Sequence, residues 1–253
     1  MSTSIPESRV NSEAKYSGAK NQKLTVIIPC FNEKKTIKEI VGKIESLTIP
    51  SWTIEIVIVD DKSTDGTREI LKNYENIHTI IYHDKNRGKG SSVKTGIIHA
   101  TGDYLLIQDA DLEYDPNDFQ SVINPILEGK TKVTNGVRIN NRLREGDRIK
   151  IGLLGWIGNH AITWTTNILY LNNAGEYEGC YKAFTKRLLD SVNVKTNDFD
   201  FDNELICKLL KRGHRIVDVP IHYYPRSYAQ GKHINWRHGF KILWTIVKCR
   251  FTD

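Results

Sequence analysis

The sequence contains few cysteines, and they are far apart. Cys30, Cys180, Cys207 and Cys249 are the four cysteines in 253 residues, and their spacing matches neither a zinc motif nor a disulfide framework. Free thiols are typical of proteins in a reducing compartment. We therefore expect a cytoplasmic protein whose cysteines are unbonded and have no chemical role.

A long apolar run is also missing. Residues 1–22 are polar and rich in serine, without the apolar core of a signal peptide, and are predicted to form a disordered tail. Residues 151–171 have the length of a membrane span, but Asn159, His160 and Asn167 make them too polar for the hydrocarbon core of a bilayer. A membrane-spanning protein is therefore not expected.

Two stretches do show the apolar periodicity of amphipathic helices. In residues 151–171 the stripe consists of Leu153, Ile157, Trp164, Ile168 and Leu171. In residues 236–251 it consists of Trp236, Phe240, Leu243, Trp244, Val247 and Phe251, flanked by Arg237, Lys241, Lys248 and Arg250. Such stripes pack against the domain or a second subunit, or rest on an anionic bilayer. Both alternatives stay open, and residues 236–253 are predicted as a helix that belongs to the main domain or faces a membrane.

The chain is basic, with a formal net charge of +6. An excess of positive charge suits nucleic acid, a membrane surface or anionic small molecules. No helix-turn-helix, zinc-finger or RNP pattern is present, so a nucleic-acid partner is not expected.

Short apolar runs alternate with helical patterns along the first half of the chain. Residues 24–29, 54–59 and 104–107 read as buried strands, and residues 34–47 and 67–74 as helices. This alternation predicts an α/β fold with a mainly parallel sheet, built from right-handed βαβ units. We expect one large domain over residues 23–235.

Polar clusters follow the three predicted strands. They are Phe31-Asn32-Glu33, Asp60-Asp61 and the acidic group Asp109, Asp111, Glu113 and Asp115. In open parallel sheets, ligands bind at the carboxyl ends of the strands. Carboxylates packed together resist burial unless a cation lies among them, and oxygen ligands of this kind suit Mg²⁺ or Mn²⁺ bound together with a diphosphate. An isolated pair of aspartates would more often be a solvated turn, but three converging clusters favour a site.

The motifs VIIPCFNE, VDDKSTDGT, NRGKGSSVKTG and DADLEYDP resemble the successive motifs of family 2 glycosyltransferases with the GT-A (Rossmann-like) fold. The closer likeness is to the dolichyl-phosphate mannose synthase and polyprenyl-phosphate glycosyltransferase branch. GCYKAF resembles the ETCYKAF element of that branch, and the later FDFDNELICKLLKRGHRIVDVPIHYYPRS and GKHINWRHG resemble further elements. The likeness extends over roughly residues 24–251, and the joint spacing of the motifs is specific.

This resemblance implies metal-dependent, inverting transfer of a hexose from a nucleotide sugar of the UDP-glucose or GDP-mannose type to a polyprenyl or dolichyl phosphate. It also implies a peripheral place on the cytosolic face of a membrane, with a membrane-embedded partner or a homodimer as further possibilities. Two alternatives remain: a surface polysaccharide or other glycan as acceptor, and a non-catalytic module that binds nucleotide sugars.

The resemblance also implies roles for individual residues. The nucleotide-sugar site would comprise Pro29, Phe31, Glu33, Asp60, Asp61, Lys89, Asp109, Ala110 and Asp111, and the metal ligands would be Asp109, Asp111 and Glu113. Asp61 has an equal claim as a cap of the following turn.

The acceptor side is implied in the same way. The acceptor would meet Arg138, Arg226 and Lys232, and the catalytic positions would be Asp109, Asp111, Arg138, Glu176 and Glu204. Glu176 stands where relatives have aspartate. A carboxylate base at Glu204 is needed only for a hydroxyl acceptor, because a phosphate is already anionic at neutral pH.

Overall fold

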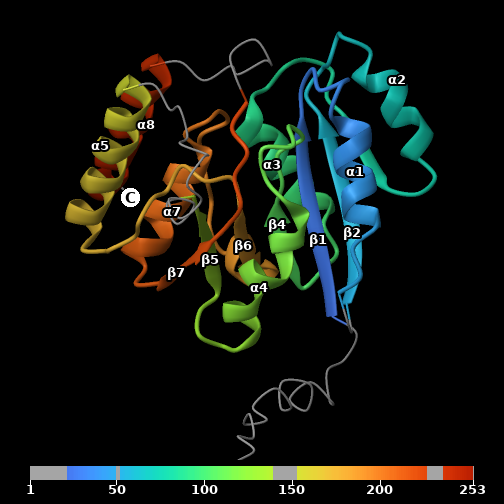
Figure 1. Cartoon of the computed structure of the whole chain (residues 1–253). Coiled ribbons are helices and arrows are strands. Elements are labelled where there is room, and N and C mark those ends of the chain that lie inside the picture. The colour runs from blue at the N-terminus through green and yellow to red at the C-terminus, as the bar shows by residue number, and fades with distance from the viewer. Residues whose placement is uncertain (1–21, 50–51, 139–152, 227–235, 253) are drawn as a thin grey trace, which may run out of the picture.

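Seven strands form one twisted sheet in the order β3-β2-β1-β4-β6-β5-β7 (Figure 1). The computed structural model describes residues 22–49, 52–138, 153–226 and 236–252. The strands are β1 (Gln22–Cys30), β2 (Trp52–Asp60), β3 (Thr79–Tyr82), β4 (Tyr104–Ile107), β5 (Val133–Val137), β6 (Lys182–Thr185) and β7 (Ile216–Pro220). The predicted tail and the basic run at Arg142, Arg144 and Arg148 lie outside the described residues.

The sheet is mixed and mainly parallel, as the alternating pattern predicts. β1 pairs in parallel with β2 and β4, and β5 pairs in parallel with β7. Among the described strands β6 alone runs antiparallel, between β4 and β5. The central strand β1 is buried on both faces from Leu24 to Ile28, which explains why its sequence is a continuous apolar run rather than an alternating one.

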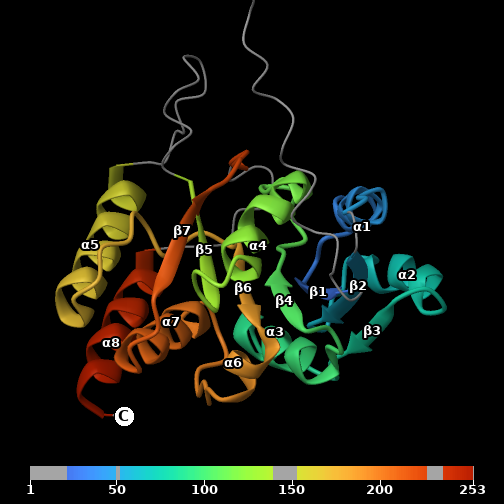
Figure 2. The ribbon, with the colours of Figure 1, turned by 90° about the horizontal axis from the view of Figure 1, so that it is seen from below.

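Helices cover both faces of the sheet (Figure 2). They are α1 (Ile37–Glu45), α2 (Thr67–Leu71), α3 (Lys89–His99), α4 (Phe119–Leu127), α5 (Leu153–Tyr170), α6 (Lys186–Asp190), α7 (Phe201–Lys211) and α8 (Trp236–Thr252), with short 3₁₀ turns at Lys72–Tyr74 and Pro116–Asp118. α1 and α4 lie on one face, and α3 and α7 on the other. α8 packs against both α5 and α7 and forms an outer layer beyond β7.

Helix α1 begins three residues later than the pattern predicts, because residues 34–36 are used to shape the loop after β1. The backbone N–H of Lys34 donates to Asp65 Oδ2 at 3.1 Å, and the Thr36 hydroxyl donates to Glu33 Oε2 at 2.7 Å. Polar side chains therefore compete with helical hydrogen bonds at this point. The result is a fixed position for Glu33 at the carboxyl end of β1.

The outer layer has its own small core. Ile162 of α5 packs with Cys207 of α7 and with Ile242, Ile246 and Cys249 of α8. All four cysteines are buried and unbonded, which confirms the expectation of free thiols. None of the helices in the described ranges combines the length and apolar character needed to cross a bilayer.

Glu55 of β2 joins β1 and the loop before β4 at the end of the sheet opposite the polar clusters. It accepts hydrogen bonds from Lys23 Nζ at 2.7 Å, the Thr25 hydroxyl at 2.5 Å and the Thr101 backbone N–H at 2.8 Å. Burial disfavours its charge, but these hydrogen bonds outweigh burial and lower the pKa of Glu55 to about 2 from its ordinary 4.5.

We expect Glu55→Gln to lower the free energy of unfolding by about 1 kcal/mol at neutral pH, because the side chain is partly exposed and its charged hydrogen bonds are screened. A depressed carboxyl pKa stabilises the fold above the ordinary pKa and loses that effect as the pH falls from about 4.5 to about 2. Denaturant titrations should therefore show the difference from wild type shrinking over that window. Glu39→Gln on the exposed surface of α1 is the control, and an equal loss there would contradict the assignment.

Candidate active site

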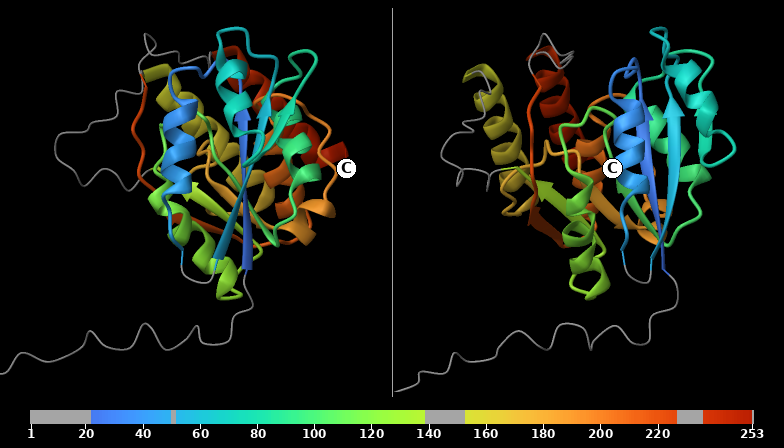
Figure 3. Two further views of the ribbon diagram at one scale, coloured as in Figure 1. Left: turned by 90° about the vertical axis from the view of Figure 1, so that its right-hand side faces the viewer. Right: turned by 45° about the vertical axis from the view of Figure 1, so that its right-hand side comes forward.

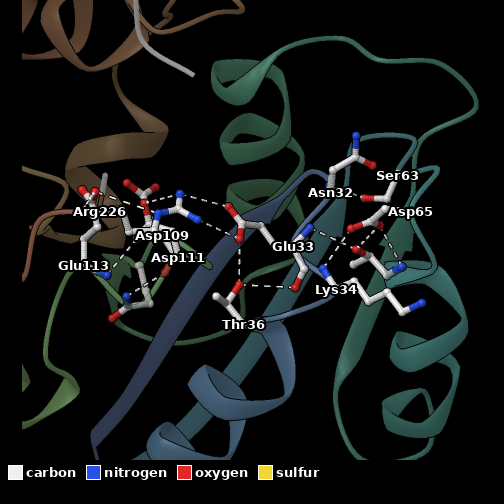
Figure 4. A network of polar contacts seen from close by, with 12 residues as sticks. Asn32, Glu33, Lys34, Thr36, Ser63, Asp65, Asp109, Asp111, Glu113 and Arg226 are labelled. Atoms are coloured by element: carbon white, nitrogen blue, oxygen red, sulfur yellow. Dashed lines mark hydrogen bonds and ion pairs between the residues drawn. The ribbon is translucent and has the colours of Figure 1, made fainter. Parts of the chain in front are cut away.

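The loops after β1 and β4 meet at one edge of the sheet and bring four carboxylates close together. Glu33 follows β1, and Asp109, Asp111 and Glu113 follow β4. Figure 4 shows the Arg226 side chain reaching these groups from the chain that follows β7. The sequence prediction that the strand-end clusters converge is therefore confirmed for the first and third of them.

Arg226 bridges the two loops. Its Nη1 and Nη2 donate to the two carboxylate oxygens of Glu33, each at 3.2 Å, and Nη2 also donates to Asp111 Oδ2 at 3.0 Å. Its backbone N–H donates to Glu113 Oε1 at 2.8 Å. The planar guanidinium suits this double contact, which a lysine could not reproduce. Arg226 was expected at the acceptor, but in this structure it faces the carboxylates.

Lys89 neutralises the remaining carboxylate. It is the first residue of α3, and its Nζ lies 2.6 Å from Asp109 Oδ1. The Asp109 backbone N–H donates to the buried Cys180 Sγ at 3.1 Å, which fixes the aspartate against the segment just before β6. Lys89, at a helix N-terminus and beside Asp109, is well placed to meet a phosphate.

The site carries more negative than positive charge. In the part of the chain that the structure describes, the cations paired with the four carboxylates are Lys89 and Arg226, so the carboxylates outnumber their cations. Burial and the neighbouring charges of Asp109 and Glu113 raise the pKa of Asp111 to about 7. Both observations fit one divalent cation, and oxygen donors are the ligands that Mg²⁺ and Mn²⁺ prefer.

Asp109 and Asp111 are the residues that would hold such a cation. In the described part of the chain, no three acidic, histidine or cysteine side chains form a ready-made metal cage. Glu113, expected as a third ligand, is instead engaged by Arg226 and by the Tyr223 hydroxyl, which donates to it at 3.1 Å. Mg²⁺ is commonly bound by one or two carboxylates together with substrate phosphates, so two aspartates suffice.

Asp60, at the end of β2, is fully buried and has one free oxygen. Its Oδ2 accepts hydrogen bonds from Arg68 Nε at 2.5 Å and the Ser63 backbone N–H at 3.2 Å, whereas Oδ1 has no partner. An unpaired buried acceptor is costly and calls for a donor. A nucleobase N–H is a donor of the right kind. Pro29 lies on the neighbouring strand β1, and the exposed Phe31 directly follows that strand.

Asp61 has contacts within the protein that were not considered from the sequence. One oxygen accepts from the backbone N–H of Arg87 at 2.9 Å and the other from that of Gly88 at 2.8 Å, and His83 Nδ1 lies 2.7 Å away. The residue therefore anchors the glycine-rich loop that presents Lys89. Gly88 has φ +92°, and a Cβ there would lie 2.4 Å from Asn197 O, so the loop requires glycine.

Arg138 and Glu176 form a buried ion pair with each other, although both were expected to act on the substrates. The Arg138 side chain donates to the Glu176 carboxylate, and its guanidinium stacks over the Tyr223 ring at 4.8 Å. The glutamate found in place of an aspartate has the reach to make this contact. Any contribution of Arg138 and Glu176 to an acceptor site therefore comes from their ion pair rather than from two independent side chains.

Glu204, expected as a possible base, is held within its own helix and the preceding loop. Its oxygens accept from the backbone N–H groups of Lys195 and Thr196 at 2.9 and 2.8 Å, and from Lys208 Nζ at 2.7 Å. A carboxylate with this many donors is a cap, not a free base. Lys232, the third expected acceptor residue, lies outside the described residues.

A narrow cavity of about 60 Å³ beside Lys89 contains residues that the sequence reasoning missed. Its lining comprises Lys89, Tyr177, Glu178, Phe199, Asp202, Asn203, His238 and Ile242. Burial raises the pKa of Glu178, and Asp202 Oδ1 is buried without a partner. Glu178 precedes GCYKAF at the place of the glutamate in the ETCYKAF element. A comparison of the two motifs could therefore have identified Glu178 as a candidate site residue.

Residues 25–191 match the family model described as "Glycosyl transferase family 2". The chain belongs to this family. The match contains the loops of Glu33, Asp60, Lys89 and Asp109 at the edge of the sheet described above.

Two curated relatives resemble the glycosyltransferase in sequence. The "UDP-N-acetylglucosamine--dolichyl-phosphate N-acetylglucosaminyltransferase" of Methanococcus voltae is 27% identical over 242 residues, covering 88% of this chain and 94% of the relative. The "Glycosyltransferase AglJ" of Haloferax volcanii is 25% identical over 202 residues, covering 79% of this chain but only 63% of the longer relative.

The fold of the glycosyltransferase is also found in solved structures. Glucosyl-3-phosphoglycerate synthase from Mycobacterium tuberculosis, in complex with UDP, superimposes with a TM-score of 0.71 at 15% identity, covering 90% of this chain and 80% of that one. A complex of the same protein with Mn²⁺, UDP and phosphoglyceric acid gives 0.68. This likeness confirms the expected GT-A architecture.

Proposed function

We propose that this glycosyltransferase is a metal-dependent inverting enzyme that transfers a hexose from a nucleotide sugar to a polyprenyl or dolichyl phosphate at the cytosolic face of a membrane. The donor is of the UDP-glucose or GDP-mannose type. The name of the Methanococcus voltae relative adds UDP-N-acetylglucosamine as a donor to be tested.

The observation that carries the proposal is the charge deficit at the carboxyl ends of β1 and β4. Among the described residues, four carboxylates face two cations, and Asp109 and Asp111 would supply oxygen ligands to a divalent ion. A bound Mg²⁺ or Mn²⁺ would neutralise the charge that grows on the leaving nucleoside diphosphate. Lys89 and Arg226 stand beside the same carboxylates and would bind the phosphates directly.

The remaining residues would have different roles, according to their positions in the site. The free Oδ1 of Asp60 would accept a hydrogen bond from the base, with Phe31 and Pro29 beside it. Asp61 would act as a positioning residue, because it fixes the backbone of Arg87 and Gly88 ahead of Lys89. A phosphate acceptor needs orientation and charge compensation more than a base, which is consistent with the full occupation of Glu204.

A donor and acceptor panel tests the proposal. The purified chain is incubated with UDP-glucose, UDP-N-acetylglucosamine or GDP-mannose, with Mn²⁺ or EDTA, and with or without a short polyprenyl phosphate. We expect a lipid-linked sugar from one donor, in the presence of metal only. Transfer that is unaffected by EDTA, or the absence of any lipid-linked product with every donor, would contradict the proposal.

Arg138→Ala should raise the KM for a polyprenyl-phosphate acceptor by roughly 10-fold, in line with a lost charge-assisted hydrogen bond of about 1.5–3 kcal/mol. Slow hydrolysis of the donor without acceptor should be preserved. Glu176→Gln serves as the matched variant, because it frees Arg138 from its partner without removing the cation. Equal loss of hydrolysis and transfer in Arg138→Ala would instead assign Arg138 to the scaffold or the donor site.

A glycan hydroxyl is the second candidate acceptor, and Asp202 is the observation that favours it. Its Oδ1 is buried without a partner and lines the cavity beside Lys89. A hydroxyl acceptor requires a base, and a free carboxylate oxygen there could supply one. Asp202→Asn should then abolish transfer to a glycan, whereas transfer to a lipid phosphate should survive.

A further inference from the structure

His83 is a buried histidine directly after strand β3, and the proposed reaction does not use it. Its side chain is 5% exposed, so the ring does not touch a substrate. Its backbone N–H donates to Asp60 O at 2.9 Å, which continues the pairing of β3 with β2 beyond the end of β3. The residue is therefore fixed relative to the carboxyl end of β2.

The first contact of the imidazole ring is with Asp61. His83 Nδ1 lies 2.7 Å from Asp61 Oδ1, and a carboxylate oxygen only accepts hydrogen bonds, so Nδ1 carries a proton. Asp61 in turn accepts from the backbone N–H groups of Arg87 and Gly88, the two residues before Lys89. Asp61 is 3% exposed, so bulk water cannot take the place of the imidazole donor. The ring therefore fixes the orientation in which Asp61 holds the glycine-rich loop.

The second contact of the ring is with helix α3. His83 Nε2 lies 3.0 Å from the Thr95 hydroxyl. Helix α3 begins at Lys89 and packs against β1 and β2, on the face of the sheet opposite α1 (Figure 3). Thr95 lies about one and a half turns along this helix from Lys89. One ring thus contacts the helix that Lys89 begins and, through Asp61, the loop that precedes it.

The backbone carbonyl of His83 acts on the base end of the site, at Asp60, whereas its ring acts on the phosphate end, at Lys89. The carbonyl accepts a hydrogen bond from Arg68 Nη2 at 2.5 Å, and the same guanidinium donates through Nε to Asp60 Oδ2. Arg68 thereby fixes the carboxylate whose Oδ1 has no partner among the described residues. A substitution of the His83 side chain keeps the carbonyl, so we expect it to disturb the phosphate end and spare the base end.

We propose that His83 is a positioning residue for phosphate binding. It acts through Asp61 and α3 to hold Lys89 beside Asp109, where Lys89 Nζ and Asp109 Oδ1 are 2.6 Å apart. A lysine side chain is flexible, and an anion site gains affinity when the backbone that carries the lysine is fixed before the ligand arrives. This inference rests on the proposed function, since it takes the phosphate at Lys89 to be that of a nucleotide-sugar donor.

Calorimetry with inorganic pyrophosphate and Mg²⁺ tests the phosphate end without a base or a sugar. We expect the wild-type chain to bind pyrophosphate and His83→Ala to weaken this binding by roughly 10-fold, the effect of one lost hydrogen bond to a charged group. Uridine and guanosine test the base end in the same way. The nucleoside that binds to wild type should bind to His83→Ala with unchanged affinity, because the carbonyl that holds Arg68 remains.

Two further variants separate positioning from packing. The amide nitrogen of His83→Asn lies about where Nδ1 was and can donate to Asp61, whereas the longer side chain of His83→Gln carries its amide toward Thr95. We expect His83→Asn to bind pyrophosphate within about 3-fold of wild type and His83→Gln to resemble His83→Ala. Packing alone predicts the opposite order, because glutamine fills more of the space of the imidazole than asparagine does.

His99→Asn is the matched control. His99 is exposed at the end of α3, and its Nδ1 lies 2.9 Å from Thr95 O. This variant should bind pyrophosphate and nucleoside like wild type. Thermal unfolding of each variant shows whether the fold persists, and unchanged nucleoside affinity shows the same for the base end.

Three outcomes would overturn the inference: wild type that does not bind pyrophosphate, His83→Ala that binds it like wild type, or His83→Gln that binds it more tightly than His83→Asn. The donor and acceptor panel, run on the same wild-type sample, keeps the two proposals distinguishable. Pyrophosphate binding that depends on His83, without sugar transfer from any donor, rejects the proposed function alone. Sugar transfer by wild type, with normal pyrophosphate binding by His83→Ala, rejects the role of His83 alone.

Discussion

Asp109→Asn and Asp111→Asn are each expected to abolish sugar transfer while leaving the fold intact. Asparagine preserves the shape of the side chain but removes the charge that would attract a divalent cation to the diphosphate. Loss of one preorganised electrostatic contact of this kind lowers the rate by about 10²–10³-fold. The measurement is the rate of product formation with saturating donor and Mn²⁺, together with thermal unfolding of each variant.

Asp103→Asn is the control for these variants. Asp103 immediately precedes the same strand β4, at its opposite end, and its side chain is exposed. It should retain wild-type activity. An Asp109 or Asp111 variant that keeps more than about a tenth of the wild-type rate would contradict the role assigned to the pair.

Arg226→Ala is expected to lower the transfer rate by roughly 10²-fold, equivalent to about 2.7 kcal/mol of transition-state stabilisation. The substitution removes one of the two cations that face the four carboxylates, and with it the fork that joins Glu33 to Asp111. Arg226→Lys should restore only part of the rate, because an ammonium group cannot reproduce the planar fork across both carboxylates.

Hydrolysis of the donor without acceptor decides between two roles for this arginine. If Arg226 acts on the diphosphate, as its position suggests, hydrolysis and transfer should fall together. If it acts on the acceptor, as the sequence resemblance implies, hydrolysis should be spared. Arg215→Ala, on an exposed arginine just before β7, should change neither rate.

Much of the part of the sheet that contains β1, β2 and β4 could be predicted from the sequence, because it depends on local patterns. Continuous apolar runs identified the buried strands β1, β2 and β4, and the parallel arrangement followed from their alternation with helices. The carboxyl ends of parallel strands meet at one edge, so the proximity of Glu33 to Asp111 was implied once the strands were assigned.

The pairing of side chains could not be predicted in the same way, since it depends on contacts between distant segments. Asp61 could not be assigned to the glycine-rich loop without knowing that β3 brings His83 and Arg87 beside it. The ion pair of Arg138 with Glu176 likewise depends on the antiparallel pairing of β6 with β5, and nothing in the sequence of β6 indicates the direction in which it runs.

Glu204 and Asp202 show a further limit of pattern reading. The two acids are two residues apart at the start of α7, and the resemblance favoured Glu204. In the structure Glu204 caps the loop before the helix, and Asp202 lines the cavity. Two side chains that are two positions apart on a helix point in directions more than half a turn apart, so the choice between them requires the three-dimensional structure of the helix.

The contact between Glu33 and Arg226 joins positions that are 193 residues apart. During synthesis on the ribosome, the first βαβ units emerge and can collapse well before Arg226 has been added to the chain. Until then Glu33 and Asp111 lack the cation that lies between them. The nascent protein is thus expected to contain formed strands β1, β2 and β4 whose carboxylate cluster still lacks its arginine, and it becomes competent for transfer only after Arg226 has joined the cluster.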